Sequence, residues 1–339
     1  MQPKYYMYYI DIVGTCNLRC PSCPSGNYQP NDFIGMRRPK GFMQLALFKE
    51  ILAKIKRENS NYEYVVIAIY NWGEPLIHPE FPKFMAAIQA QGFYSDVSTN
   101  LNIKDVKPLV KASPDKVIVS LSGYTPTVYS QTHKRGNPHL VVANLYMLRY
   151  FMDRLKKNFP VELSYHLYRH NVGYDVERII SIANDLGFHF CSDYTYLMPL
   201  EKNLKYFNGI LSSQDQAIIP LMLVKPEEQI KLAKSHHLTN CLLWDRPTIN
   251  FDGSVGLCCA VYDYEHNIAT NFLEVSHQEL EIRKHKHKLC KICMDKGLDK
   301  VAAGVAREEI DTLIEQRLTE LGSSLQRDTS HLRRDCFVY

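Results

Sequence analysis

The sequence predicts an α/β protein, namely a partial (β/α)6 barrel of the TIM-like kind followed by a small domain rich in cysteine. Two observations favour this fold. Over residues 5–200, β-branched and aromatic runs alternate six times with segments whose apolar residues recur at helical spacing, which is typical of a parallel sheet. Five of the ten cysteines then lie between residues 241 and 293, where this alternation has ended.

The elements of the barrel follow from these patterns in order. The run at 64–70 is unbroken and apolar, as expected of a strand that is covered on both faces. The predicted strands cover residues 8–13, 64–70, 94–99, 116–121, 161–168 and 188–197. The predicted helices cover residues 43–57, 81–91, 106–112, 141–157 and 176–186. In such a sheet the reactive groups lie on the loops that leave the C-terminal ends of the strands.

The chain divides into four predicted parts. Residues 1–200 form the barrel, and residues 201–240 form a linker with short helices, because the periodicity weakens there. Residues 241–300 form the cysteine-rich domain. Residues 301–339 form a C-terminal helix and tail, since apolar residues recur at helical spacing over 308–321 and Gly322 is a natural stop.

Composition excludes several classes of protein. Lys and Arg number 40 against 36 Asp and Glu, so the net charge of +4 is too small for a dedicated nucleic-acid binder, and we expect no DNA partner. No apolar run has the length of a membrane span, and residues 1–14 lack the pattern of a secretory signal. We therefore expect a cytoplasmic protein whose cysteines are metal ligands, catalytic thiols or core residues rather than disulfides. The oligomeric state is not predicted.

The first cysteine cluster is Cys16, Cys20 and Cys23, which lie on the loop after the first strand. Three thiolates on so short a loop suit three irons of a four-iron cluster, because sulfur is a soft ligand. One iron is then left without a protein ligand. A structural zinc site would instead need a fourth Cys or His nearby, and the sequence has none through Met36.

This spacing resembles the signature of the radical S-adenosylmethionine (radical SAM) superfamily, with Ser22 in place of the usual aromatic residue. The resemblance implies a 4Fe-4S cluster whose open iron chelates SAM, and a 5′-deoxyadenosyl radical as the reagent. It also implies that residues at successive strand ends bind SAM, with Glu74 on the amino group and Arg169 on the carboxylate. The implied SAM-binding residues are Gly73, Glu74, Pro75, Ser98, Asn100, Ser120, Ser122 and Arg169.

The second cluster is formed by four cysteines around a predicted hairpin at 248–257, whose turn is Asp252-Gly253. These cysteines are Cys241, Cys258, Cys290 and Cys293. Their spacing resembles the auxiliary-cluster domains of radical SAM enzymes, of the SPASM and shorter twitch types, which implies an auxiliary 4Fe-4S cluster. A zinc ribbon remains the alternative. The basic run at 283–291 is either a solvated helix face or a set of cations that offset the charge of the cluster.

Cys259 follows a predicted ligand directly and cannot easily bind the same cluster, so it is a candidate hydrogen-atom donor to a substrate radical. Cys191 is expected in the core, and Cys336 lies near the C-terminus. Further polar contacts to a substrate are expected from residues that follow the strands. They are His133, Lys134, Arg135, Tyr165, His166 and Tyr168.

The resemblance favours net oxidation or epimerisation of a small polar substrate of the sugar, aminocyclitol or nucleoside type. Four ligands fill a four-iron cluster, which favours electron acceptance by the auxiliary cluster. A flavodoxin- or ferredoxin-like electron donor is expected as partner. The alternatives are a maturase of a ribosomally made peptide, which we disfavour because the barrel begins by residue 5, and, in another class, a non-catalytic zinc- or RNA-binding protein.

Overall fold

The computed structural model describes residues 5–25, 27, 38–59, 64–236, 240–305 and 307–327. These residues form one eight-stranded sheet in the order β6-β5-β4-β3-β2-β1-β7-β8. All neighbouring strands from β6 to β7 are parallel. The first six strands are β1 (Tyr5–Ile10), β2 (Tyr64–Ala68), β3 (Tyr94–Thr99), β4 (Lys116–Ser120), β5 (Val161–Leu167) and β6 (His189–Tyr194). The predicted α/β partial barrel is therefore confirmed.

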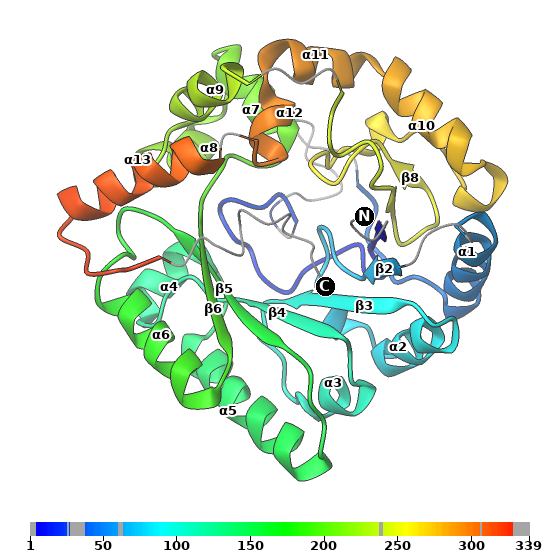
Figure 1. Ribbon diagram of the computed structural model, residues 1–339, viewed down its shortest axis with the longest axis horizontal. Coiled ribbons are helices and arrows are strands. Elements are labelled where there is room, and N and C mark those ends of the chain that lie inside the picture. The colour runs from blue at the N-terminus through cyan, green and yellow to red at the C-terminus, as the bar shows by residue number, and fades with distance from the viewer. Residues whose placement is uncertain are drawn as a thin grey trace.

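The chain between these strands forms helices, most of which lie outside the sheet (Figure 1). They are α1 (Leu45–Glu58), α2 (Phe81–Ala90), α3 (Lys107–Ala112), α4 (Pro126–Thr132), α5 (Pro138–Leu155) and α6 (Tyr174–Leu186). Sequence periodicity misses α4, which is only two turns long. It begins at Thr125, whose side chain accepts a hydrogen bond from the Val128 amide, and Pro126 occupies the first helical position.

The strands bury both faces, as the apolar runs predict. On β1, the residues Tyr6, Tyr8 and Ile10 belong to the large core under the helices. Met7 and Tyr9 point to the other face, where they form a smaller cluster with apolar residues of β2. This inner face lines the barrel and carries the side chains that build the site.

The first strand starts and ends three residues earlier than predicted. Its register is set by β2, because Tyr5 pairs with Tyr64 and Tyr9 with Ala68. Asp11 follows the strand and uses its carboxylate to accept hydrogen bonds from the Trp72 and Gly73 amides. The strand ends at Ile10, and the Asp11 amide makes one more hydrogen bond, of 2.9 Å, to the Ile249 carbonyl, although the apolar pattern continues to Val13.

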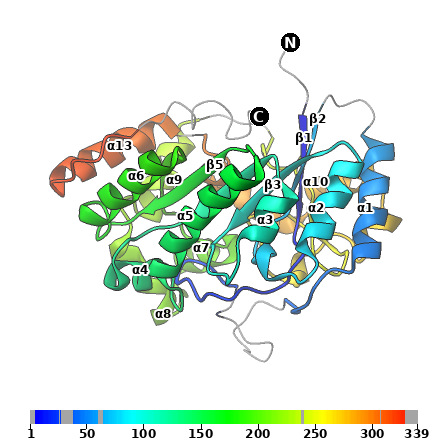
Figure 2. The same ribbon diagram turned by 90° about the horizontal axis from the view of Figure 1, so that it is seen from below.

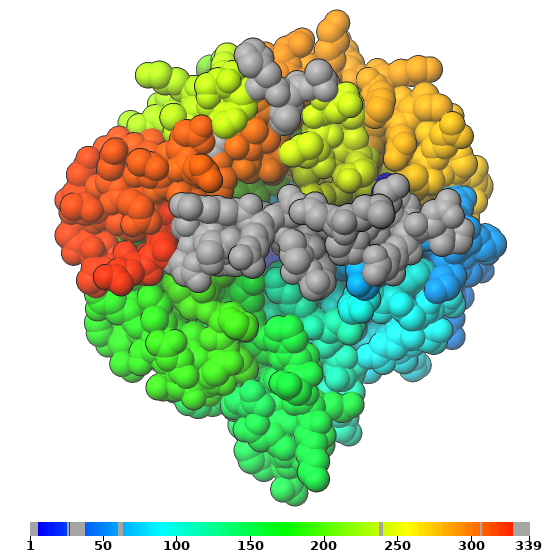
Figure 3. Space-filling view, in the orientation of Figure 1, coloured from blue at the N-terminus to red at the C-terminus, as the bar shows by residue number. Residues whose placement is uncertain are grey.

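The second half of the chain closes the ring that the barrel leaves open, and it occupies the upper half of the molecule in Figures 1 and 3. Its helices are α7 (Leu200–Phe207), α8 (Ser213–Gln216), α9 (Pro226–Lys234), α10 (His277–Lys286), α11 (Lys288–Lys296), α12 (Leu298–Ala302) and α13 (Arg307–Glu320). Its strands are β7 (Thr248–Ile249) and β8 (Val255–Gly256). The short 3-10 helices of the molecule are η1 (Pro75–Ile77), η2 (Ile219–Leu221), η3 (Tyr264–His266) and η4 (Phe272–Glu274).

The predicted hairpin forms, and it also extends the barrel sheet. β7 and β8 are antiparallel, and Gly253 adopts a φ of 85° in the turn. β7 pairs in parallel with β1, with Tyr9 opposite Thr248. The cysteine-rich segment is thus hydrogen-bonded to the edge of the barrel.

The opposite edge of the sheet, at β6, is held by α13, which lies beside α6 in Figure 2. The Arg307 guanidinium lies 2.8 Å from the Asp193 carboxylate of β6 and also pairs with Asp311. Arg327 reaches Asp311 at 2.9 Å. Within the part of the chain that the structure describes, no helix is long and apolar enough to cross a membrane.

Candidate active site

The loop after β1 carries the first three thiols and holds two of them, Cys20 and Cys23, in a braced turn. The Cys23 amide donates to the Cys20 carbonyl at 3.0 Å. Asn27 reinforces the turn, because its side-chain amide donates to the Cys20 carbonyl at 2.8 Å and to the Cys23 carbonyl at 2.7 Å. Leu18 is buried between Cys16 and this turn. Cys16 precedes the turn by four residues, and its thiol accepts a hydrogen bond of 3.4 Å from the Leu18 amide.

Asp11 connects this loop to the loop after β2, and sequence reasoning missed it. Its carboxylate is 1% exposed, pairs with Arg38 and accepts hydrogen bonds of 3.1 Å from the Trp72 and Gly73 amides. Burial raises the pKa of Asp11, while Arg38 and the amides act in the opposite direction. The available signal was one acidic residue inside an apolar strand run.

We expect Asp11→Ala to lower the free energy of unfolding by about 3–5 kcal/mol, because it leaves the Arg38 charge and two amides buried without their partner. Urea unfolding under anaerobic conditions measures this. Asp153→Ala is the control, since Asp153 is exposed and pairs with Arg149 at the surface, and it should cost less than about 1 kcal/mol. Equal effects of the two substitutions would contradict this role of Asp11.

The Gly73-Glu74-Pro75 loop packs directly on the segment that leads to the thiols. A Cβ atom at Gly73 would lie 1.7 Å from the Val13 carbonyl oxygen, so no other residue fits there. The Glu74 amide donates to the Thr15 carbonyl at 2.9 Å. Pro75 begins the 3-10 helix η1. These contacts fix the Glu74 side chain in the interior, where it is 2% exposed.

The Glu74 carboxylate accepts hydrogen bonds from three groups. They are the Leu76 amide at 3.0 Å, the Thr99 hydroxyl at 2.7 Å and the Asn100 amide at 2.8 Å. Burial raises the pKa of Glu74 to about 7. The Asn100 side chain also donates to the Cys16 thiol at 3.6 Å, and burial, followed by the Glu74 charge, raises the pKa of that thiol. Glu74, Asn100 and Cys16 therefore lie together.

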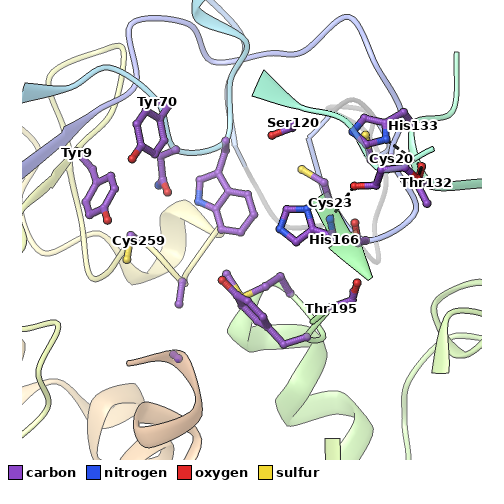
Figure 4. A pocket seen from close by; sticks show the side chains of 18 of the residues that line it. Tyr9, Cys20, Cys23, Tyr70, Ser120, Thr132, His133, His166, Thr195 and Cys259 are labelled. Atoms are coloured by element: carbon purple, nitrogen blue, oxygen red, sulfur yellow. Dashed lines mark hydrogen bonds between the residues drawn. The ribbon is translucent and has the colours of Figure 1, made fainter. Parts of the chain in front are cut away.

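A cavity of about 420 Å³ opens between the thiol loop and the second half of the chain. Figure 4 shows Cys20, Cys23 and His166 toward one end and Tyr9, Tyr70 and Cys259 toward the other. The side chains around it come from strand ends, loops and the C-terminal half. They are Tyr9, Cys20, Ser22, Cys23, Tyr70, Asn71, Trp72, Ser120, Ser122, Thr132, His133, His166, Tyr168, Thr195, Tyr196, Met198, Leu243, Cys259, Ala260 and Ala302.

Only some of the predicted SAM-binding residues line the cavity. Ser120 and Ser122 line it. Ser98 is half-buried in β3 and does not line it, and Arg169 is exposed, with its amide bonded to the Leu221 carbonyl at 2.8 Å. The structure thus does not bring Arg169 into the cavity, because the chain turns outward after β5.

Of the expected polar contacts, His133, His166 and Tyr168 line the cavity, whereas Tyr165 is buried on the outer face of β5 and donates to the Asn171 carbonyl. Burial, together with the neighbouring His166, lowers the pKa of His133 to about 3. Burial also lowers the pKa of His166. Both imidazoles are therefore neutral near pH 7 and offer hydrogen bonds rather than charge.

A second, mostly apolar cavity is lined by all four cysteines of the second cluster, Cys241, Cys258, Cys290 and Cys293. Helix α11 presents two of them one turn apart. In the described ranges, no three Cys, His, Asp or Glu side chains are already gathered as a metal site. The donor set of four thiols around one cavity nevertheless fits the ligands of an iron–sulfur or zinc centre. Cys336 lies outside the described residues.

The two cavities share a wall. Leu243, Ala260 and Ala302 line both of them. The neighbouring thiols of Cys258 and Cys259 face the second and the first cavity, respectively. A hydrogen bond from Cys259 lowers the pKa of Cys258 to about 7 and raises that of Cys259. A centre in the second cavity would therefore lie directly behind the wall of the first.

Comparison with known proteins identifies the family. The sequence pattern described as "Radical SAM superfamily" matches residues 10–203, which is more than half of the chain. The chain belongs to the radical SAM superfamily. Its cofactors are accordingly SAM and a 4Fe-4S cluster, and the matched residues run from β1, through the thiol loop, into α7.

Several known proteins are similar in sequence or fold. A tungsten-containing aldehyde ferredoxin oxidoreductase cofactor-modifying protein of Pyrococcus furiosus is 28% identical over 116 residues, which are 33% of this chain and only 30% of that protein. Native anSMEcpe with bound AdoMet has a TM-score of 0.55 at 14% identity, over 95% of this chain and 100% of that chain. SuiB of Streptococcus suis bound to S-adenosylmethionine has a TM-score of 0.56 at 11% identity, over 88% and 72%. The structural likenesses establish the fold.

Proposed function

We propose that this radical SAM protein oxidises a small polar substrate and carries a second, auxiliary 4Fe-4S cluster in a domain of the SPASM or twitch type. Cys16, Cys20 and Cys23 hold the SAM-binding cluster. The auxiliary cluster is held by Cys241, Cys258, Cys290 and Cys293. With SAM and both clusters bound, the first site supplies a 5′-deoxyadenosyl radical that takes hydrogen from the substrate. The auxiliary cluster supplies an electron acceptor.

The observation that carries this proposal is the wall shared by the two cavities. Cys20 and Cys23 lie at one end of the first cavity and Cys259 at the other, with Cys258 directly behind it. A substrate bound between these ends is close both to the SAM-binding thiols and to the second set. That arrangement suits net oxidation, because the substrate would lose a hydrogen atom on one side and an electron on the other.

Glu74 and Asn100 are proposed to bind SAM. The Glu74 carboxylate is preorganised by its three hydrogen bonds and suits the SAM ammonium group. Asn100 connects Glu74 to Cys16 and so holds the carboxylate beside the cluster. Ser120 and Ser122, on the cavity wall, suit the hydroxyl groups of the ribose.

The far end of the cavity has the side chains that a small polyhydroxylated ligand requires. Tyr9, Tyr70 and Tyr196 offer phenol groups on aromatic surfaces, and the Tyr70 hydroxyl lies 3.3 Å from the Asp96 carboxylate. A volume of about 420 Å³ is at the small end of ligand sites, and SAM must share it. These features favour a sugar, aminocyclitol or nucleoside over a long peptide. The reducing partner is proposed to be a flavodoxin- or ferredoxin-like protein.

Epimerisation is the second candidate, because Cys259 faces the cavity. In that reaction the Cys259 S–H bond breaks and a C–H bond forms on the substrate radical, and the sulfur then needs an electron and a proton from the external reductant. In oxidation, the substrate radical would instead lose a proton to solvent and an electron to the acceptor that Cys241, Cys258, Cys290 and Cys293 would hold. The two reactions therefore differ in whether the product gains hydrogen from a thiol that exchanges with water.

We expect Cys259→Ser to keep at least about a tenth of the rate of product formation, because oxidation does not need the thiol. The measurement uses candidate sugars, aminocyclitols and nucleosides in deuterated water, with mass spectrometry of the product. Oxidation gives a product without solvent deuterium at the reacting carbon. Solvent deuterium at that carbon, lost in Cys259→Ser, would establish epimerisation instead. Turnover of peptides alone would favour the maturase.

SAM binding is expected to weaken as the pH falls through 7. Burial raises the pKa of Glu74 to about 7, so at lower pH the carboxyl group is protonated and no longer attracts the ammonium group. SAM affinity should fall about fivefold from pH 7 to pH 6, measured by equilibrium dialysis on the reconstituted protein. Glu74→Gln should bind SAM about tenfold more weakly without this pH dependence. Glu80→Gln is the control, since Glu80 pairs with Lys83 at the surface. A pH dependence that survives Glu74→Gln would contradict this role.

A further inference from the structure

Lys284 is buried, unlike the other Lys and Arg side chains of the basic run at 283–291. It lies in α10 and is 1% exposed, whereas Arg283 and Lys286 on the same helix are exposed. Its ammonium group donates hydrogen bonds to the carbonyl oxygens of Trp244 at 2.8 Å and Arg246 at 3.0 Å. Burying a lysine is costly unless its charge is compensated. No ion pair to a carboxylate compensates it among the residues that the structure describes.

Most of the titratable groups that act on Lys284 are cysteines. Burial lowers its pKa, while Cys258, Cys259, Asp245 and Cys290 raise it, in that order. Cys258 and Cys290 line the second cavity, and so does Trp244, whose carbonyl accepts the hydrogen bond of 2.8 Å from Lys284. The Lys284 charge therefore lies beside the cavity of the four cysteines.

The two carbonyl groups also fix the position of this charge. An ammonium group has three donors, and two of them are held by Trp244 and Arg246, which lie between Cys241 and β7. Leu257, Val261 and Met294, among the residues that line the second cavity, are apolar. A charge interacts more strongly across such surroundings than through water. Because of its fixed position and these apolar surroundings, the Lys284 charge would interact strongly with a metal centre in this cavity.

We propose that Lys284 is a positioning residue that raises the reduction potential of the auxiliary cluster. Reduction adds one electron to a centre that already carries four thiolates, and a fixed cation nearby stabilises the reduced form. The electron comes from the substrate radical, which becomes the oxidised product after it loses a proton. The inference rests on the proposed function, since it requires an iron–sulfur cluster on the four cysteines.

The test isolates the auxiliary cluster in the full chain with the substitutions Cys16→Ala, Cys20→Ala and Cys23→Ala. Iron and sulfide are measured first, after anaerobic reconstitution. The reduction potential is then measured by titration followed with electron paramagnetic resonance. In this background, Lys284→Gln removes the charge and keeps a donor, and Lys284→Arg keeps the charge. Lys286→Gln makes the same charge change at an exposed position of the same helix.

We expect Lys284→Gln to lower the ratio of reduced to oxidised cluster about tenfold at fixed potential, which is a shift of about 59 mV to more negative values for one electron. Lys284→Arg should restore most of the shift, and Lys286→Gln should change little. A cluster with unchanged potential in Lys284→Gln would overturn the inference and leave the proposed function intact. Absence of iron and sulfide from the triple variant would overturn the proposed function. If Lys284→Gln assembles no cluster, the potential of Lys284→Arg decides: a value unlike that of the parent overturns the inference.

Discussion

Replacing Cys20 by alanine is expected to lower the formation of 5′-deoxyadenosine from SAM by more than about a thousandfold. The thiol lies in the braced turn after β1, at the end of the cavity opposite Cys259. Loss of one of three ligands leaves the cluster without a stable site, so SAM has neither its iron nor its electron source. The measurement is chromatography of the products after anaerobic reconstitution and reduction with dithionite.

Cys191→Ala is the matched control for this prediction. Cys191 is 7% exposed in β6 and lines neither cavity, so it should act as a core residue and its loss should leave SAM cleavage close to that of the parent. Cleavage that persists in Cys20→Ala would mean that the thiols of the first loop do not hold the SAM-binding cluster. Cleavage lost equally in both variants would indicate general destabilisation instead.

The second large effect is expected from the vicinal pair Cys258 and Cys259. Cys258→Ala should lower the iron content from roughly eight to roughly four atoms per chain and substrate oxidation by more than about a hundredfold, while SAM cleavage continues. Cys259→Ala should keep the full iron content, because its thiol faces the first cavity. The two substitutions are chemically identical and adjacent, so only the direction of the side chain distinguishes them.

Iron analysis and a turnover assay on the two variants show which of the two cysteines is a ligand of the auxiliary cluster. Loss of about four irons from Cys259→Ala rather than Cys258→Ala would reverse the assignment. Zinc in place of iron, removed by Cys258→Ala, would support the zinc ribbon that the spacing also permits.

Most of the barrel could be predicted because its signals are local. The apolar run at 64–70 and the helical periodicity at 43–57 predict β2 and α1 with only small errors at the ends. The pairing of β7 with β1 could not be predicted, since it joins residues some 240 positions apart, and no local pattern encodes such a contact. The same limit explains the position of β1, which is set by the register with β2.

In the site, too, local signals were readable from the sequence and long-range contacts were not. The thiol loop and Glu74 were predictable because short spacing and strand ends identify them. The position of Arg169 after β5 did not reveal that this residue is exposed and away from the cavity, so its role in SAM binding stays a prediction. Asp11 and Lys284 were not identified as individual residues, since each derives its role from burial against distant parts of the chain. A charged residue amid apolar or basic neighbours was their only sign in the sequence.

The central claim is that this radical SAM enzyme holds two clusters, one on each side of a shared cavity wall. The most direct test is iron and sulfide analysis of the anaerobically reconstituted chain. The same analysis is made on the variant that carries Cys16→Ala, Cys20→Ala and Cys23→Ala. We predict roughly eight irons and eight sulfides per parent chain and roughly four of each in the variant. A parent chain with only four irons, all lost in the variant, would contradict it.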